Sequence, residues 1–257
     1  MACITKRNLN KVKSVERTGV ASTAGEGLTV AAVGAVLGWF AGQWLHPIVG
    51  AVMAAIAGVN GLVSGWRGVY AWRATRGWLA FVLDSTWATL SVGVGLLAHA
   101  MAVASKGGGY HRALSHRENR HVYCGGANLQ PGMALTVGNV ISNAGDVSRE
   151  GRHKLITDHE AVHVWQARWF GPLYLPLYGL WSLAGVAGGV VIWLRRGRND
   201  SLGKAIESCS YYLNPFEWWA YSRDGYWPPA GLLNGLGWRK PAARPFAEIR
   251  RRPQKPE

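Results

Sequence analysis

Two apolar stretches, LTVAAVGAVLGWFAGQW (28–44) and IVGAVMAAIAGVNGLVSGW (48–66), decide the architecture of the N-terminal part of the chain. Neither contains a charged residue, and the short break between them holds His46 and Pro47. A helix needs about 20 apolar residues to cross the hydrocarbon core of a bilayer. The two stretches therefore predict a transmembrane helical hairpin with a tight turn.

Small residues recur at every fourth position in both stretches, which places them along one face of each helix. Such faces let helix backbones approach closely in lipid, where packing drives association. They predict that the two helices pack on each other, or that glycine-rich helices of several copies assemble into a homo-oligomer. The small residues are Gly34, Gly38 and Gly42 in the first stretch and Gly50, Ala54 and Gly58 in the second.

The composition supports a membrane protein. Only 16% of the 257 residues are charged, against about 25% in an average soluble domain. The net charge of +14 suits basic segments that flank apolar spans and meet anionic headgroups. No nucleic-acid recognition motif accompanies this charge, so we expect the lipid bilayer and no specific nucleic acid as a partner. We expect an integral membrane protein of a bacterial inner membrane, with residues 1–27 as a retained basic segment.

A third apolar run, Ser85 to Ala104, predicts another span, with Asp84 capping its start. His99 lies deep within this run, and we expect it to be bonded to a neighbouring helix. Transmembrane helices therefore fill residues 28–104. The rest of the chain to residue 240 is more polar, and a basic tail at 241–257 is expected to be disordered.

The segment LITDHEAVHVWQ (155–166) carries the strongest chemical motif. On a helix, His159 and His163 lie one turn apart and can share one Zn²⁺, while Glu160 can act as general base. Such a site needs a third protein ligand, and Glu217 in NPFEWWA (214–220) is the carboxylate that we expect to supply it.

The segment before this helix, YCGGANLQPGMALTVGNVIS (123–142), is rich in turn residues and ends in β-branched residues. It predicts a short strand or β-hairpin. Gln166 lies one turn beyond His163, where it can support the metal ligands. Arg168, Tyr221 and Arg223 are further candidates for stabilising an oxyanion, because they are near the motifs in sequence.

Taken together, ALTVGNVIS and LITDHEAVHVWQ resemble the HExxHxxQ group of zincin-like metallopeptidase domains. NPFEWWAY is similar to the Glu-x-x-Ala stretch from which gluzincins take their third zinc ligand. Asp158 departs from the pattern, because a small or apolar residue usually precedes the first histidine. The resemblance implies an α+β, mostly α fold, with a small zincin-like domain at 105–240 after the N-terminal helices. The matching residues are Thr136, Gly138 and Ile141 in the strand, His159, Glu160, His163, Val164 and Gln166 in the helix, and Glu217 downstream.

The apolar segment 171–194 creates a conflict with this site. If it crossed the bilayer as one helix, His159 and Glu217 would lie on opposite sides of the membrane. Its prolines, Pro172 and Pro176, and its glycines permit a broken or re-entrant segment that returns the chain to the side it left. We prefer this interpretation to abandoning Glu217 as a ligand.

The sequence thus predicts a membrane-associated zinc metallopeptidase that acts on a peptide or protein substrate. Zn²⁺ would be bound by His159, His163 and Glu217, with Glu160 as the catalytic base. The alternative is a non-catalytic membrane scaffold or glycine-zipper protein whose zincin-like core is structural or degenerate. A basic, membrane-associated nucleic-acid binder is a third reading of the charge.

Overall fold

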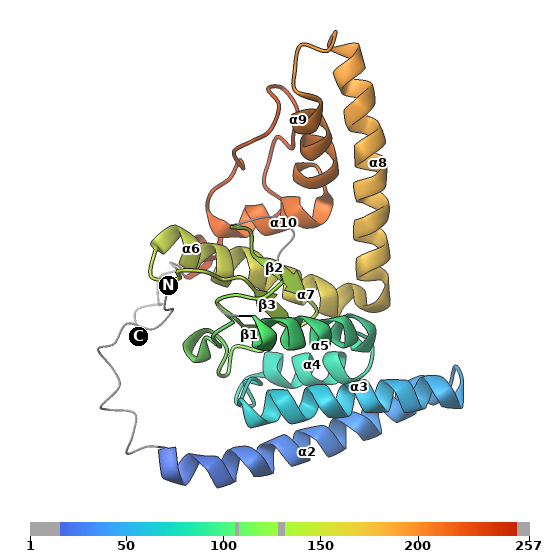
Figure 1. Ribbon diagram of the computed structural model, residues 1–257, viewed down its shortest axis with the longest axis vertical. Helices are drawn as coiled ribbons and strands as arrows, with labels where there is room; N and C mark the ends of the chain where they lie inside the picture. Colours follow the sequence, from blue (N-terminus) through green and yellow to red (C-terminus); the bar gives the residue numbers. More distant parts are fainter. Residues whose placement is uncertain (1–15, 106–107, 128–131, 251–257) are drawn as a thin grey trace, which may run out of the picture. The chain divides into compact units, whose positions relative to one another are not determined.

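The computed structural model describes residues 16–105, 108–127 and 132–250 of the chain (Figure 1). The described residues are mostly helical, with one small three-stranded sheet. The first 15 residues of the basic N-terminal segment and residues 251–257 of the tail lie outside the described residues.

The chain divides into two compact units. The first unit contains residues up to 156 and also 164–172, and the second contains 157–163 together with 173 onwards. This division differs from the expected boundary after residue 104. The small sheet belongs to the same unit as the N-terminal helices, because its strands pack on one of them.

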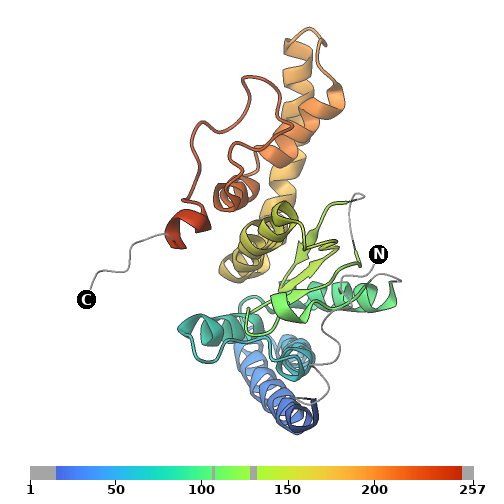
Figure 2. The same ribbon diagram turned by 90° about the vertical axis from the view of Figure 1, so that its left-hand side faces the viewer.

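The N-terminal hairpin consists of α2 (Glu16–Gln43) and α3 (Pro47–Trp66), which lie side by side (Figures 1 and 2). Residues 23–43 and all of α3 are long and apolar enough to cross a membrane. The imidazole of His46 accepts a hydrogen bond from the Ile48 backbone at 3.2 Å, which caps the start of α3. The predicted hairpin is thus present as two candidate membrane helices.

Helix α2 begins 12 residues before the predicted apolar stretch. Its N-terminal turns include Glu26, which accepts hydrogen bonds from both Arg117 and the indole of Trp72, at 2.6 and 2.7 Å. These partners satisfy a carboxylate inside the helix. Part of the segment expected as a separate basic region at 1–27 is therefore helical.

The small-residue faces of α2 and α3 pack on each other within the chain. A Cβ atom on Gly38 would lie 2.7 Å from the Met53 carbonyl oxygen, and one on Gly61 would lie 2.6 Å from that of Val30. The helix backbones are therefore too close at these two points for a side chain.

The predicted third apolar run, Ser85 to Ala104, is helical over most of its length, as α5 (Thr89–Ala104). Helix α4 (Thr75–Ser85) precedes it, and the two helices are bent by 90° at the break between them, as in a broken span or a re-entrant loop. Asp84 does not cap α5, because its carboxylate is fully buried and pairs with Arg168 at 2.8 Å. This buried ion pair holds the end of α4 against the residue Arg168 of α7.

His99 is buried in α5, and its partner is not another helix. Its Nδ1 atom lies 2.8 Å from the hydroxyl of Tyr123, which follows the first strand. The expectation of a buried, hydrogen-bonded histidine was correct, but the expected helical partner was not.

The sheet contains β1 (His121–Val122), β2 (Leu135–Val137) and β3 (Val140–Ser142) in the order β1-β3-β2. Strands β2 and β3 form an antiparallel hairpin, whereas β1 pairs with β3 in parallel. Gly138 in the two-residue turn has a φ of 58°, and an added Cβ would lie 2.4 Å from the Ser91 carbonyl oxygen. The predicted hairpin is confirmed, and its glycine allows close packing on α5.

A continuous helical run leads from α6 (Glu150–Lys154) through a π-helical turn, Leu155–Glu160, into α7 (Ala161–Phe170). A short 3₁₀ turn then leads into α8 (Tyr174–Arg195). The whole run is the third candidate membrane helix. The HExxH motif lies on a helix, as predicted.

Helix α8 is an unbroken helix of 22 residues, so a break of the helix within residues 174–195, one of the two forms expected for this segment, is excluded. Pro172 lies in the 3₁₀ turn and Pro176 in the first turn of α8, where a missing backbone N–H is tolerated. After α8 the chain reverses direction. The next two elements, α9 (Leu202–Glu207) and a π-helical turn, Ser208–Tyr212, pack against α8.

Two further helices follow the return. Helix α10 (Pro215–Asp224) carries Glu217, and α11 (Phe246–Arg250) lies in the tail that was expected to be disordered. The backbone N–H of Ala242 donates to the Ser222 hydroxyl at 2.7 Å. This contact orders the start of the tail against α10.

Candidate metal centre

The two histidines of the HExxH motif point their Nε2 atoms at the same place. His159 lies one helical turn before His163, and the Nε2 atoms of the two residues are 3.3 Å apart. The side chains are only 2% and 8% exposed. The π-helical turn that contains His159 widens the helix locally, a feature that is frequent at functional sites.

Glu217 reaches the histidines from the first turn of α10. The Asn214 side chain starts this helix by accepting a hydrogen bond from the Phe216 backbone at 3.0 Å, and Pro215 occupies the first helical position. Glu217 Oε2 is 3.3 Å from Nε2 of His159, and Oε1 is 3.4 Å from Nε2 of His163. All three predicted ligands are therefore together in the second unit.

The geometry of this group fits a metal ion. Ligand atoms at about 2.0 to 2.1 Å from a tetrahedral metal lie about 3.3 to 3.4 Å from one another. Nε2 of His159 lies at that spacing, 3.3 Å, from both Nε2 of His163 and Oε2 of Glu217, and with one ligand atom from each residue all three lie within 4.8 Å of one another. Among the described residues, Oε2 of Glu217 is a buried oxygen that accepts no hydrogen bond. The buried group of His159, His163 and Glu217 can thus hold a metal ion.

The electrostatics of Glu217 also favour its role as an anionic ligand. Burial alone would raise the pKa of its carboxyl group, but the imidazoles of His163 and His159 have the larger combined effect. They hold the pKa of Glu217 well below its ordinary value. In the metal-free protein this carboxylate is therefore charged at neutral pH and pairs with the two imidazoles, whose protons a bound metal would replace.

Asp224 is a member of the site that the sequence did not identify. Its Oδ2 atom is 3.4 Å from Nδ1 of His159, on the opposite side of the ring from the metal-facing nitrogen. A carboxylate in this position orients a metal-binding imidazole. Asp224 follows Glu217 by seven residues, which is two turns of α10, so this spacing is the signal from which the sequence could have suggested it.

Two tyrosines from the first turns of α8 also contact the ligands. The Tyr178 hydroxyl donates to Oε1 of Glu217 at 2.8 Å, and the Tyr174 hydroxyl lies 3.3 Å from Nδ1 of His163. The two residues are four apart and so share one helix face. The sequence did not identify them, because the whole segment 171–194 was assigned to the membrane.

Glu160 and Asp158, which flank His159, are both buried. The Thr157 hydroxyl donates to Oδ1 of Asp158 at 3.2 Å. Tyr221, predicted from its nearness in sequence, packs on the ring of His159 with the ring centres 4.5 Å apart. Glu160, Asp158 and Tyr221 all belong to the same unit as the metal ligands.

The remaining predicted residues have other surroundings. Arg223 donates to the Arg244 backbone oxygen at 3.2 Å and lies over the ring of Phe246, so it holds the tail. Arg168 is paired with Asp84 in the first unit. Gln166 is fully buried and also belongs to the first unit.

Comparison with known proteins gives no relative for this chain. No protein-family model matches it, and neither the curated proteins nor the solved structures contain a significant match. The function of this chain is therefore inferred from the geometry of the site.

Proposed function

We propose that this chain is a membrane-bound zinc metallopeptidase that hydrolyses peptide bonds. The observation that carries the proposal is the buried group of two imidazoles and one carboxylate, whose ligand atoms all lie within 4.8 Å of one another. Three helices are long and apolar enough to cross a membrane, which supports a membrane location.

The donor set favours zinc over other common metals. Two imidazole nitrogens and one carboxylate oxygen are a ligand set of catalytic zinc sites, in which the fourth position is left for water or substrate. Ca²⁺ and Mg²⁺ prefer sets made of oxygen atoms. When bound, zinc supplies Lewis-acid chemistry and lowers the pKa of its water to about 7.

The protein itself would supply the proton transfers. Glu160 follows His159 directly in the chain, and its side chain is buried. In the proposed reaction, Glu160 takes a proton from the attacking water and delivers it to the leaving amine. Asp224 and Tyr174 would hold the two imidazoles in the orientation that the ligands require.

A structural metal is the second candidate function. The side chains of His159, Glu217 and His163 are 2%, 4% and 8% exposed, and such closure is typical of structural sites. In that case the metal would join the HExxH helix to α10 in a non-catalytic membrane scaffold.

One set of variants separates these functions. The full chain, Glu160→Gln and His163→Ala would be purified in detergent, and each would be assayed for bound zinc and for hydrolysis of a fluorogenic peptide library. A peptidase predicts that Glu160→Gln keeps its zinc and loses hydrolysis by at least about 100-fold. Zinc without hydrolysis in the unaltered chain would favour the structural metal. An unaltered chain without stoichiometric zinc, or full zinc in His163→Ala, contradicts both.

A further inference from the structure

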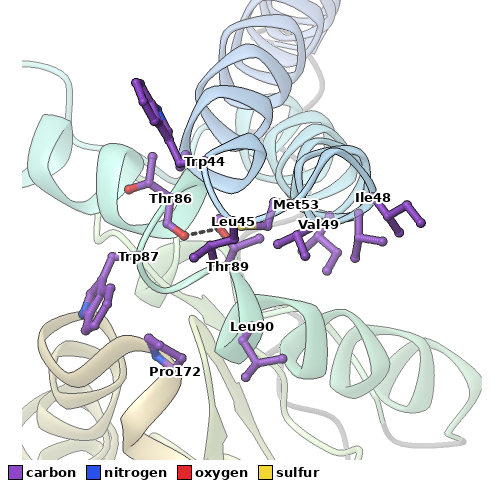
Figure 3. Close-up of a pocket in the computed structure, with 13 residues that line it drawn as sticks. Trp44, Leu45, Ile48, Val49, Met53, Thr86, Trp87, Thr89, Leu90 and Pro172 are labelled. Carbon is purple, nitrogen blue, oxygen red and sulfur yellow. Dashed lines mark hydrogen bonds between the residues drawn. The ribbon is translucent and has the colours of Figure 1, made fainter.

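A cavity of about 670 Å³ lies in the first unit, and none of its described lining residues is a metal ligand (Figure 3). One wall is the turn between α2 and α3 with the first turns of α3, represented by Trp44, Leu45 and Ile48. The other wall is the bend between α4 and α5, represented by Trp87 and Leu90. Its volume lies within the range of about 300 to 1,000 Å³ that is usual for small-ligand sites.

The chemistry of the walls selects an apolar ligand. None of the described lining residues is charged. The hydroxyls of the lining residues Thr86 and Thr89 both donate to backbone oxygens, at 2.7 and 2.6 Å. The Trp87 indole likewise donates to the Trp169 backbone oxygen, at 3.1 Å. A ligand in this cavity must therefore gain its affinity by burying hydrocarbon.

The cavity is fixed by the fold. The Ser91 hydroxyl donates to the Gly171 backbone oxygen at 3.1 Å, and the Trp87 indole packs against Gly171 itself. Gly171 has a φ of 52°, and a Cβ atom there would lie 2.4 Å from the indole nitrogen. These contacts hold the bend between α4 and α5 and so fix this wall of the cavity.

The place of the cavity in the fold indicates the source of the hydrocarbon. It lies at the turn that joins two candidate membrane helices, and this turn must be at a boundary of the bilayer when both helices cross it. Trp44 and Trp87, which are 86% and 47% exposed, are the residue type that is enriched at this boundary. The acyl chain of a lipid at this boundary of the bilayer can therefore enter the cavity.

We propose that this cavity binds one acyl chain of a membrane phospholipid, with the headgroup at the level of Trp44 and Trp87. The bound chain contacts Leu45 and Ile48 on one side and Leu90 on the other. The proposal depends on the apolar lining and on the candidate membrane helices, and it is independent of the metal centre.

Two matched variants of α5 test this site. Leu90 lines the cavity, whereas Leu97 is an exposed leucine of the same helix that does not. The full chain, Leu90→Trp and Leu97→Trp would be reconstituted with phosphatidylcholine, extracted into detergent, and analysed by native mass spectrometry. We expect one retained phospholipid on the full chain and on Leu97→Trp, and at least tenfold less on Leu90→Trp. Thermal unfolding of both variants would show whether their folds are retained.

Several results would overturn the proposal. Loss of lipid from both variants, or from neither, would mean that the retained lipid lies elsewhere on the apolar surface. A full chain that retains oleate but no phospholipid would point to a free fatty acid. A dimer that dissociates in Leu90→Trp alone would identify a second copy of the chain as the occupant.

Discussion

At the scale of single residues, the metal ligands depend on neighbours that hold them in place. Nδ1 of His159 lies 3.4 Å from Asp224, and Oε1 of Glu217 receives the Tyr178 hydroxyl at 2.8 Å. Such partners fix the tautomer and orientation of a ligand, and their loss typically reduces metal affinity by about 10- to 100-fold. The site should therefore respond to changes that leave all three ligands intact.

The first prediction concerns Asp224→Asn. Oδ1 of Asp224 accepts a hydrogen bond from the Tyr226 backbone at 2.8 Å, and asparagine can keep this bond. The charge beside His159 is lost, so we expect zinc affinity to fall by about 10- to 100-fold while the fold is retained. Competition with a fluorescent zinc chelator measures the change. Asp200→Asn, at an ion pair beyond α8, is the matched control, and equal affinities in both variants would contradict the role of Asp224.

The second prediction concerns Tyr178→Phe, which removes one hydroxyl and keeps the ring stacked on Phe216. Glu217 then loses the donor that fixes its Oε1 atom, and we expect zinc affinity to fall by about tenfold. The d–d spectrum of the Co²⁺-substituted protein should also change, because the carboxylate can reorient. Tyr212→Phe serves as the control, and an unchanged Co²⁺ spectrum in Tyr178→Phe would show that the hydroxyl does not position Glu217.

The sequence could predict the three ligands because their pattern is local or chemically distinctive. His159 and His163 are one helical turn apart, and Glu217 lies in a short motif of its own. The supporting residues could not be predicted in the same way. Tyr174 contacts His163 of α7 and Tyr178 contacts Glu217 of α10, and tertiary contacts of this kind leave no periodic signal in the sequence.

At the scale of elements, the return of the chain along α8 brings Glu217 back to the histidines. Gly185 and Gly189 allow this return, because an added Cβ would lie 2.4 Å from Cα of Ser210 and 2.6 Å from Cα of Ile206, respectively. The composition of 171–194 correctly indicated an apolar segment, although its prolines and glycines do not break the helix. It could not show that a polar segment after residue 201 would pack against that helix.

The third prediction tests this close approach with two substitutions in one helix. Gly185→Ala places a methyl group against the backbone of the π-helical turn, whereas nothing lies within 4 Å of a Cβ atom at Gly188. We expect Gly185→Ala to cost about 1 to 3 kcal/mol in the free energy of unfolding and to weaken zinc binding. Gly188→Ala should be neutral or slightly stabilising. Chemical denaturation in detergent, with and without zinc, measures both effects, and equal stabilities would refute the close contact.

The bend between α4 and α5 shows the limit of composition at this scale. The apolar run from Ser85 to Ala104 begins where α4 ends, and the residues Thr86 to Ala88 separate α4 from α5 at a bend of 90°. Beside this bend, Asp84 is buried against Arg168, which is 84 positions away in the chain. Hydropathy reports the length of an apolar run, but it does not report such a bend or such a distant partner.

At the scale of the whole molecule, the metal group constrains the membrane topology. His159 and Glu217 share one group of ligand atoms, so the chain between them must leave and return on the same side of a bilayer. Helix α8 has 22 residues and can extend about 33 Å at 1.5 Å per residue. Its partner α9 has six residues and carries Lys204 and Glu207, so it is no second apolar span.

The fourth prediction follows from this constraint. Lys154 precedes the metal-binding histidines, and Lys240 follows α10; both side chains are accessible. We expect Lys154→Cys and Lys240→Cys to react with a membrane-impermeant maleimide from the same side of sealed vesicles. The unaltered chain measures background labelling of the native cysteines. If the chain crosses the membrane an even number of times between positions 154 and 240, both cysteines must be labelled from the same side. Labelling from opposite sides would mean that residues 155–239 cross the membrane an odd number of times, in which case His159 and Glu217 could not bind one ion.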